Sequence, residues 1–528
     1  MKIRPTLSGI FFCVFLGCGT DRGHSQTVEP QTAPAPTGAS ITPQYRVPSG
    51  EQRKIVLISD LHLGLGRNAD GRWNPMEDFR WTAALKGFLA EISRWGNDAV
   101  DLVVVGDFLE LWQPPDGMEC PGVSLEIGCS VDFMTRLASL VVRAHAADLA
   151  LVRDFSMRGE NRLHVIPGNH DSSLLVASVW QPLADALDVA SGRIDFVSSG
   201  TWSSRDGRIV AEHGHQIGLD ANRYSSWPAI LREVNGTAYL ERPWGERFVQ
   251  VLFNQAEKEY EIIDNLAPET VGAKYRLQDR GAWTSAGDIA RFIAFNLFET
   301  SARQEIVFLG RPDGRPPEFD MKIARDLGYR LFSEALADQD PWRAQIEAND
   351  DLKREMTALA ADRSRLPDPE VRALCEQIAG KGKRLCQLPT AGSRLQSRLI
   401  PRRHILAQHF VQILHRFPGM VVFVYGHTHQ WEKGWRVDVT GGGQVTVFNT
   451  GAFQRITDES GFLARAERKG VAPAQALRVL QLSDLPPCYT AVRISYESGA
   501  SRGETIQWRM DETDSAGQIL EPGSSACQ

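Results

Sequence analysis

Residues 165–171 read Val-Ile-Pro-Gly-Asn-His-Asp, a short apolar run followed by a glycine and three polar side chains. Four other loops have a similar arrangement: Asp60-Leu61-His62, Gly106-Asp107, His213-Gly214-His215 and Gly426-His427-Thr428-His429. The five apolar runs, at 55–58, 102–105, 165–166, 209–211 and 420–425, are rich in β-branched residues and short enough to be buried strands. Carboxylate, amide and imidazole groups at several strand ends suit a cluster of divalent metals, and no thiolate takes part.

Composition excludes some classes of protein. The chain has 528 residues, and 42% of them are hydrophobic, which is ordinary for a globular protein. The net charge is −7 and the pI is about 6.0, so a non-specific nucleic-acid binder held by a basic face is not expected. We therefore expect no sequence-specific nucleic acid among its partners.

The N-terminus predicts export. Lys2 and Arg4 precede an apolar stretch at 7–17 that is too short to span a bilayer and ends at Cys18. Residues 16–18 resemble a bacterial lipobox, although Phe15 and Leu16 depart from it, so Cys18 is the expected site of a lipid anchor. Simple secretion is the alternative. We expect a signal peptide at 1–18, and a disordered tether at 19–50 that is rich in Pro, Thr, Ser, Gln and Ala.

Six cysteines remain after the two in the leader are set aside. They form three pairs of neighbours along the sequence, and this proximity suggests the disulfides Cys120–Cys129, Cys375–Cys386 and Cys488–Cys527. Six cysteines allow 15 connectivities, so other pairings and free thiols stay open. An oxidising compartment favours bridges.

More than two hundred residues separate His215 from His427, which is too long for an unstructured loop. Apolar spacing predicts helices at 247–263, 289–298, 318–338, 342–361 and 369–378, so residues 240–400 are expected to form a mostly helical insertion. The flanking parts, 51–239 and 401–528, would form one core. In the second part we expect a helix at 404–417 and strands at 435–439, 444–449, 491–496 and 505–510.

The order and chemistry of the five loops resemble the calcineurin-like metallophosphoesterases. That resemblance implies a four-layer αββα sandwich and a centre of two divalent metal ions, with Mn, Fe, Zn and Co all compatible. Asp60 and His62 match the ligands of one metal, and Asp107 matches the carboxylate that bridges both. Asn169 and His213 match ligands of the second metal, while the closing loop divides its histidines, His427 to the second metal and His429 to the first.

The resemblance also implies a reaction, in which a metal-bridging hydroxide attacks a phosphate mono- or diester in line. His170 matches the general acid, and Asp171 is expected to orient its imidazole and raise its pKa. Glu110 matches an acidic position that supports the centre without binding metal. Substrate contacts are expected from Asn169, His170, His215 and Arg223, although His215 and Arg223 also fit plain structural roles.

Within this superfamily, Asp-Leu-His-Leu at 60–63 and Gly-Asp-Phe-Leu-Glu-Leu-Trp at 106–112 look like the UDP-2,3-diacylglucosamine pyrophosphatases. Two departures argue against that activity: His170 stands where those enzymes tend to have arginine, and the chain carries an export signal. Hydrolysis of a phosphate ester is therefore the expected function. A pyrophosphatase acting on a nucleotide-sugar or lipid-linked diphosphate, or a non-catalytic metal-stabilised surface protein, is the alternative. The natural substrate and the oligomeric state stay open.

Overall fold

The computed structural model describes the chain from residue 53 onward, with gaps. The described residues are 53–120, 122–218, 222–267, 271–272, 274–276, 278–280, 347–348, 402–439, 443–497, 500–514 and 516–527. The predicted helices at 289–298, 318–338, 342–361 and 369–378 lie outside this part of the chain, apart from two residues. The limits 240–400 of the insertion therefore stay a prediction.

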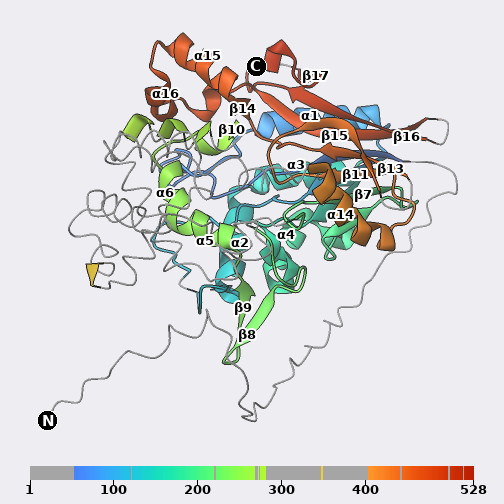
Figure 1. Ribbon diagram of the computed structural model, residues 1–528, viewed down its shortest axis with the longest axis horizontal. Helices are drawn as coiled ribbons and strands as arrows, with labels where there is room; N and C mark the ends of the chain where they lie inside the picture. The colour runs from blue at the N-terminus through green and yellow to red at the C-terminus, as the bar shows by residue number, and fades with distance from the viewer. Residues whose placement is uncertain are drawn as a thin grey trace, which may run out of the picture. The chain divides into compact units, whose positions relative to one another are not determined.

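One sheet has seven strands in the order β17-β16-β15-β1-β2-β4-β5. Its parallel part contains β1 (Lys54–Ile58), β2 (Val100–Val105), β4 (Arg162–Ile166) and β5 (Ile194–Phe196). Its antiparallel part contains β15 (Cys488–Glu497), β16 (Ala500–Arg509) and β17 (Gln518–Leu520). The C-terminal strands therefore complete a sheet that the N-terminal strands begin (Figure 1).

A second sheet has five strands in the order β12-β13-β11-β7-β6. Its members are β6 (Thr201–Ser203), β7 (Ile209–Glu212), β11 (Val422–Tyr425), β12 (Glu432–Asp438) and β13 (Gln444–Asn449). Strands β7, β11 and β13 run parallel, so their carboxyl ends meet at one edge. The strands predicted at 435–439, 444–449, 491–496 and 505–510 are confirmed as β12, β13, β15 and β16.

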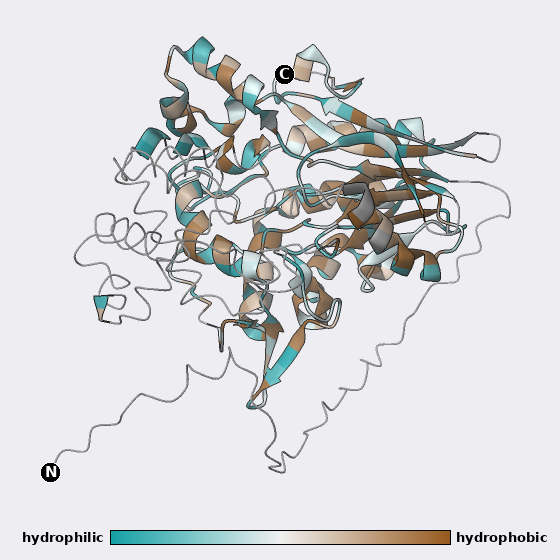
Figure 2. Ribbon diagram, in the orientation of Figure 1, coloured by the Kyte–Doolittle hydropathy of each residue, from teal (hydrophilic) through white to brown (hydrophobic). Residues whose placement is uncertain are grey.

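The two sheets pack face to face. Side chains alternate between the faces of a strand, so Leu57 of β1 packs toward Val424 of β11, whereas Val56 points to the opposite face. Both faces of β1 are covered, which explains its continuous apolar sequence. Figure 2 shows the strands of this region mostly in the brown of hydrophobic residues.

Helices cover both outer faces. Helices α1 (Thr82–Trp95), α2 (Val131–Ala144), α3 (Ala146–Met157) and α4 (Ala177–Leu187) pack on the seven-stranded sheet. Leu406 and Phe410 of α14 (Arg402–Arg416) pack on Phe423 of the five-stranded sheet. The predicted helix at 404–417 is thus confirmed, and so is the four-layer αββα sandwich.

The smaller elements surround this core. A three-stranded sheet contains β3 (Ile127–Ser130), β8 (Leu231–Val234) and β9 (Thr237–Glu241), and a two-stranded sheet pairs β10 (Leu266–Ala267) with β14 (Thr457–Asp458). The two helices that follow β14 were not predicted from the sequence; they are α15 (Glu459–Lys469) and α16 (Pro473–Val479). Short 3₁₀ turns are η1 (Ser172–Leu175), η2 (Val189–Ser191), η4 (Ile263–Asn265), η7 (Leu482–Asp484) and η8 (Ser525–Cys527).

The predicted helix at 247–263 is only partly correct. The structure has α5 (Trp244–Phe248), a π-helical turn η3 (Val249–Phe253) and α6 (Asn254–Glu257), after which the helix ends. Asn254 donates to the backbone carbonyl of Trp112 at 3.3 Å, and Glu257 accepts from Gln113 at 2.7 Å. These contacts with the core, together with the buried Tyr260, replace the continuation that apolar spacing suggested.

Two of the predicted disulfides are confirmed. Cys120 joins Cys129, and Cys488 joins Cys527, with Cα–Cα distances of 5.2 and 5.8 Å. Cys375 and Cys386 lie outside the described residues. Disulfides form and persist in oxidising compartments, such as those that exported proteins reach. Export of this chain stays a prediction. None of the described helices is both long enough and apolar enough to cross a membrane.

Candidate metal centre

The carboxyl ends of strands from both large sheets converge on one site. Asp60 and His62 follow β1, Asp107 follows β2, and the backbone N–H groups of Asp60 and His62 donate to the carbonyls of Gly106 and Asp107 at 3.1 and 3.0 Å. In the five-stranded sheet, the N–H of Gly426, after β11, donates to the carbonyl of His213, after β7, at 2.8 Å. The loops after adjacent strands are thus tied together, which fixes the spacing of their side chains.

The backbone of this site is unusual. Five of the non-glycine residues with positive φ are candidate ligands: Asp60 (53°), His62 (50°), Asp107 (49°), His427 (72°) and His429 (53°). Side chains seldom adopt this left-handed conformation because the Cβ crowds the backbone. Strain of this kind concentrates at functional sites, where the surrounding structure holds it in place.

Two glycines of the motifs allow ligands from different strands to approach each other. A Cβ on Gly106, whose φ is +85°, would lie 2.2 Å from His213 Nδ1. A Cβ on Gly168 would lie 2.1 Å from Asp107 Oδ1. Both distances are far below van der Waals contact, so any larger residue would push a candidate ligand away.

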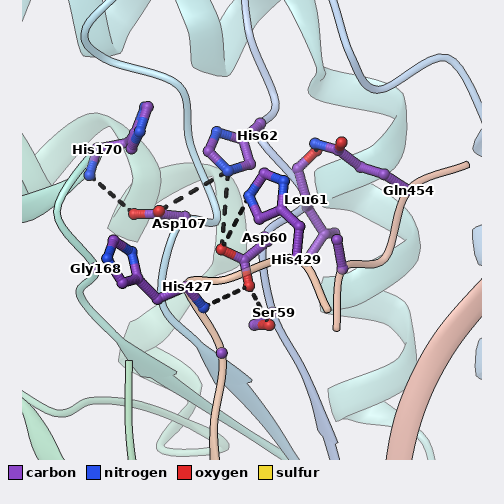
Figure 3. A network of polar contacts seen from close by, with 12 residues as sticks. Ser59, Asp60, Leu61, His62, Asp107, Gly168, His170, His427, His429 and Gln454 are labelled. Carbon is purple, nitrogen blue, oxygen red and sulfur yellow. Dashed lines mark hydrogen bonds and ion pairs between the residues drawn. The ribbon is translucent and has the colours of Figure 1, made fainter. Parts of the chain in front are cut away.

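Asp60, His62 and His429 form the first donor group (Figure 3). The Oδ1 atom of Asp60 lies 3.4 Å from His429 Nε2 and 3.9 Å from His62 Nε2. Asp60 Oδ1 and His62 Nε2 are buried and have no hydrogen-bond partner. Burial favours the neutral imidazole, but the carboxylates of Asp60 and Glu110 raise the pKa of His62 well above 6.5.

Asp107, His213 and His427 form the second donor group, and Asn169 adjoins it. His213 Nε2 lies 3.0 Å from Asp107 Oδ2 and 2.9 Å from Asn169 Oδ1. Asp107 Oδ2 is also 3.8 Å from His62 Nε2 in the first group. The Asp107 carboxylate therefore lies between the two groups, as expected of a bridging ligand.

His213 shows why these donors fit a cation. Its Nδ1 atom donates to the Val105 carbonyl at 2.9 Å, so the neutral ring presents a lone pair at Nε2. That lone pair faces the oxygens of Asp107 and Asn169. Burial would lower the pKa of His213, but the Asp107 carboxylate raises it to about 9. A divalent metal held among these three atoms would remove the conflict without protonation, so the residues suit the metal that the sequence implies.

Glu110 connects the metal centre to His170. Its Oε2 atom accepts from Nδ1 of His62 at 2.9 Å and from Nδ1 of His170 at 2.5 Å. Burial would raise the pKa of Glu110, but the two histidines lower it to about 2, so the carboxylate stays ionised. Trp112 stacks on His170 with a ring-centroid distance of 4.1 Å and fixes its plane.

Asp171 does not orient His170, and that prediction is wrong. Its Oδ2 atom accepts the backbone N–H groups of Phe108 and Leu109, at 2.8 and 3.2 Å, and its Oδ1 atom accepts that of Gly168 at 2.6 Å. Asp171 therefore joins the loop after β4 to the loop after β2. The physical reason is that a buried carboxylate lies where unpaired backbone N–H groups need an acceptor, and Glu110 is left to bind the imidazole.

The tentative substrate contacts differ in what the structure offers. His170 N–H donates to Asp107 Oδ1 at 2.8 Å, so its backbone is held against the centre. His215 is buried, and its ring meets that of Trp227 at 4.3 Å between centroids. Arg223 donates to the backbone carbonyls of Gln216 and Gly218, the latter at 2.9 Å. His215 and Arg223 thus have structural contacts, and a role in binding substrate stays a prediction.

Sequence reasoning missed a group of residues around Asp60. Ser59 donates to Asp60 Oδ2 and lies 2.6 Å from the hydroxyl of Thr450. Asn449 donates to the Gly426 carbonyl at 3.1 Å and to the Thr428 hydroxyl at 3.0 Å. Asn449 ends β13 and Thr450 follows it, as the other motifs follow their strands, and this position was the signal that could have revealed them.

A buried ion pair supports the loop after His62. Glu77 accepts the backbone N–H of Gly66 at 2.5 Å, and His145 Nε2 lies 3.3 Å from Glu77 while Nδ1 lies 2.9 Å from Asp148. Burial lowers the pKa of His145, but these carboxylates outweigh that effect and raise it to about 9. The charged histidine therefore stabilises the folded chain.

We expect this stabilisation to be lost at alkaline pH. Because the pKa of His145 rises from 6.5 to about 9 on folding, its contribution is complete below pH 6.5 and disappears as the pH rises through 9. The free energy of unfolding should fall by on the order of 3 kcal/mol over this range, relative to His145→Asn. Urea denaturation of both proteins at several pH values gives the free energy of unfolding as a function of pH. The same pH dependence in the wild type and in His145→Asn would contradict the prediction.

Among the comparisons with known proteins, a match to a protein family agrees with the site. Residues 53–291, somewhat under half of the chain, match the family model of the calcineurin-like phosphoesterases. No curated protein matches the sequence. A crystal structure of a dimetal phosphatase from Danio rerio is 10% identical, with 89% of this chain and 98% of that chain covered, but its TM-score of 0.27 supports no argument.

Three observations converge on one class of protein. The described strands and helices form a four-layer sandwich, the donor groups lie at the carboxyl ends of strands, and the family match covers four of the five ligand loops. Residues 53–291 therefore resemble the calcineurin-like phosphoesterases, and the fold and the donor groups support a metal-dependent phosphoester hydrolase.

Proposed function

We propose that the chain hydrolyses phosphate mono- or diesters at a centre of two divalent metal ions. Asp60, His62 and His429 would hold one ion, and Asn169, His213 and His427 the other, with Asp107 shared. The shared position of Asp107 carries this proposal, because one oxygen lies 3.8 Å from His62 Nε2 and 3.0 Å from His213 Nε2.

Two cations held here would activate water as a nucleophile and neutralise charge on the phosphoryl oxygens. The protein's part is to hold the donors in place. Val105 and Glu110 accept the Nδ1–H of His213 and His62, which directs the Nε2 lone pair of each ring into the site. The carboxylates of Asp60 and Asp107 balance the positive charge that the centre would gather.

His170 is the proposed general acid. Its Nδ1 is bound to Glu110, so Nε2 is the atom that can deliver a proton to the leaving oxygen. The Oε2 atom of Glu110 accepts from Nδ1 of the ring, and Trp112 holds the plane of the ring. A proton donor matters most for an alcohol leaving group, which departs poorly as an alkoxide. This is why we favour an ester over a diphosphate as the substrate.

Metal removal and reloading test the proposal. The purified chain, stripped with a chelator and titrated with Mn²⁺, should bind two ions and recover turnover in proportion to loading. Bis-p-nitrophenyl phosphate and p-nitrophenyl phosphate, assayed in parallel, would show whether diesters or monoesters are preferred. A chain that takes up two ions and hydrolyses neither ester would contradict a general phosphoesterase, and one that binds no metal would remove the basis of the proposal.

A further inference from the structure

A second group of polar residues adjoins the metal centre and has no part in holding metal. We call Asp78, Gln113, Glu257, Asp264 and Asn265 the acceptor cluster. Asp78 precedes α1, Gln113 follows β2, Glu257 ends α6, and Asp264 and Asn265 lie on η4. The cluster therefore combines residues of the core with residues that follow β9.

Hydrogen bonds connect the acceptor cluster to the catalytic loops. Gln113 comes three residues after Glu110 and donates to Glu257 Oε2 at 2.7 Å. On the other side, Asn265 Nδ2 lies 3.3 Å from Gln454 Oε1, and Gln454 donates to the carbonyl of Leu61 at 3.3 Å. Figure 3 shows Gln454 beside Leu61, the residue between Asp60 and His62. A group bound at the cluster would thus lie next to the metal centre.

Three buried oxygens of the cluster have no donor. They are Gln113 Oε1, Glu257 Oε1 and Asn265 Oδ1, on side chains whose residues are 3%, 5% and 0% exposed. The nitrogens of Gln113 and Asn265 already donate, which fixes the oxygen end of each amide. A buried acceptor without a partner is costly, so these atoms call for a ligand that brings hydrogen-bond donors.

Carboxyl groups also crowd together in the cluster. Burial and the neighbouring carboxylates of Asp264 and Asp78 raise the pKa of Glu257 well above its usual value. The cations nearest in sequence are engaged, since Arg80 pairs with Glu261 at 2.6 Å and Lys258 pairs with Asp116 at 2.5 Å. A positively charged ligand would relieve the crowding.

The spacing of the carboxylates argues against a third metal ion. Among the described residues, the groups whose donor atoms lie within 4.8 Å of one another are those of the metal centre and the His62–Glu110–His170 set. Asp78, Glu257 and Asp264 are not among them, so these three carboxylates do not form a compact metal-ligand group. Asp78 and Asp264 are partly exposed, which gives a ligand access from solvent.

We propose that the acceptor cluster binds a primary ammonium group on the organic part of the substrate, so that the preferred ester is an aminoalkyl or amino-sugar phosphate. This inference rests on the proposed function. A primary ammonium carries three N–H donors and one positive charge, which match the three unpartnered oxygens and the carboxylates. A quaternary ammonium has the charge but no donors, and a hydroxyl has a donor but no charge.

Binding and turnover test this separately. Calorimetry on the metal-loaded chain would compare 2-aminoethylphosphonate with n-propylphosphonate, an isosteric pair that is not hydrolysed. Kinetics would compare O-phosphoethanolamine with n-propyl phosphate, 2-hydroxyethyl phosphate and phosphocholine. We expect the aminoethyl compounds to be favoured over the propyl compounds by about 10- to 100-fold in affinity and kcat/KM, as for hydrogen bonds to charged groups.

Variants then locate the preference. Glu257→Gln and Asp264→Asn should each reduce the aminoethyl-to-propyl ratio at least severalfold. Asp154→Asn, which removes a carboxylate on α3 that is 68% exposed, should leave the ratio unchanged. Equal binding of the two phosphonates would overturn the inference, even if p-nitrophenyl esters are hydrolysed. So would equal preference for phosphocholine or 2-hydroxyethyl phosphate. If no ester is hydrolysed but 2-aminoethylphosphonate binds preferentially through Glu257, the cluster stands and the proposed hydrolysis fails.

Discussion

Replacing Asp107 by alanine is expected to abolish turnover and to leave the chain unable to hold two metal ions together. The Asp107 carboxylate lies between both donor groups and also accepts the backbone N–H of His170 at 2.8 Å. Activity should fall by roughly three orders of magnitude or more, because the centre supplies several kcal/mol and each 1.4 kcal/mol corresponds to about tenfold. Metal analysis and assay of bis-p-nitrophenyl phosphate would measure both effects.

The control for this variant is Asp195→Ala. Asp195 is an exposed carboxylate on β5, 3.5 Å from His164, and its removal should change neither metal content nor rate. Circular dichroism would show that both variants keep the fold. Full activity in Asp107→Ala, with two ions bound, would exclude Asp107 as a shared ligand.

Replacing His170 by alanine should have an effect that depends on the leaving group. General acids contribute about 100- to 10,000-fold, and this should be lost for esters of simple alcohols. A p-nitrophenolate ion departs without a proton, so p-nitrophenyl esters should lose much less. The measurement is kcat for a series of esters with alcohols of increasing pKa. The slope of log kcat against that pKa should be steeper in the variant than in the wild type.

Glu110→Gln belongs to the same test. The glutamine keeps the shape but removes the charge that holds both His62 and His170, so the rate should fall by about 10- to 100-fold, as for other residues that position metal ligands. His164→Ala serves as the matched control, because His164 lies on β4 against Trp202 and pairs with Asp101 and Asp195. If His170→Ala slowed all esters equally, His170 would position the substrate and would not donate the proton.

The strands could be predicted from the sequence, and the structure brings the candidate donors that follow them close together. Each candidate ligand follows directly after an apolar run, and the carboxyl ends of parallel strands such as β1 and β2 necessarily meet at one edge. The disulfides Cys120–Cys129 and Cys488–Cys527 could also be predicted from the sequence, because each joins cysteines that are neighbours along the chain.

Contacts between distant segments were not predictable in this way. Asp171 adjoins His170 in sequence, yet Glu110, which is 60 residues away, binds the imidazole. The difference depends on which buried backbone N–H groups lack an acceptor, and only the packed loops decide that. The helix predicted at 247–263 ends early for a similar reason, because Glu257 is held by Gln113 of the core.

The donors come from both faces of the sandwich. Asp60, Asp107 and Asn169 follow strands of the seven-stranded sheet, whereas His213 and His427 follow strands of the five-stranded sheet. Cations bound among these donors would link the two sheets. Only the folded chain would bind them, because only there do the donors lie together. Because the donors span residues 60 to 429, the centre is complete only when the beginning and the end of the chain have come together. The full donor set therefore exists only in the folded chain, and a partly assembled molecule lacks a complete centre.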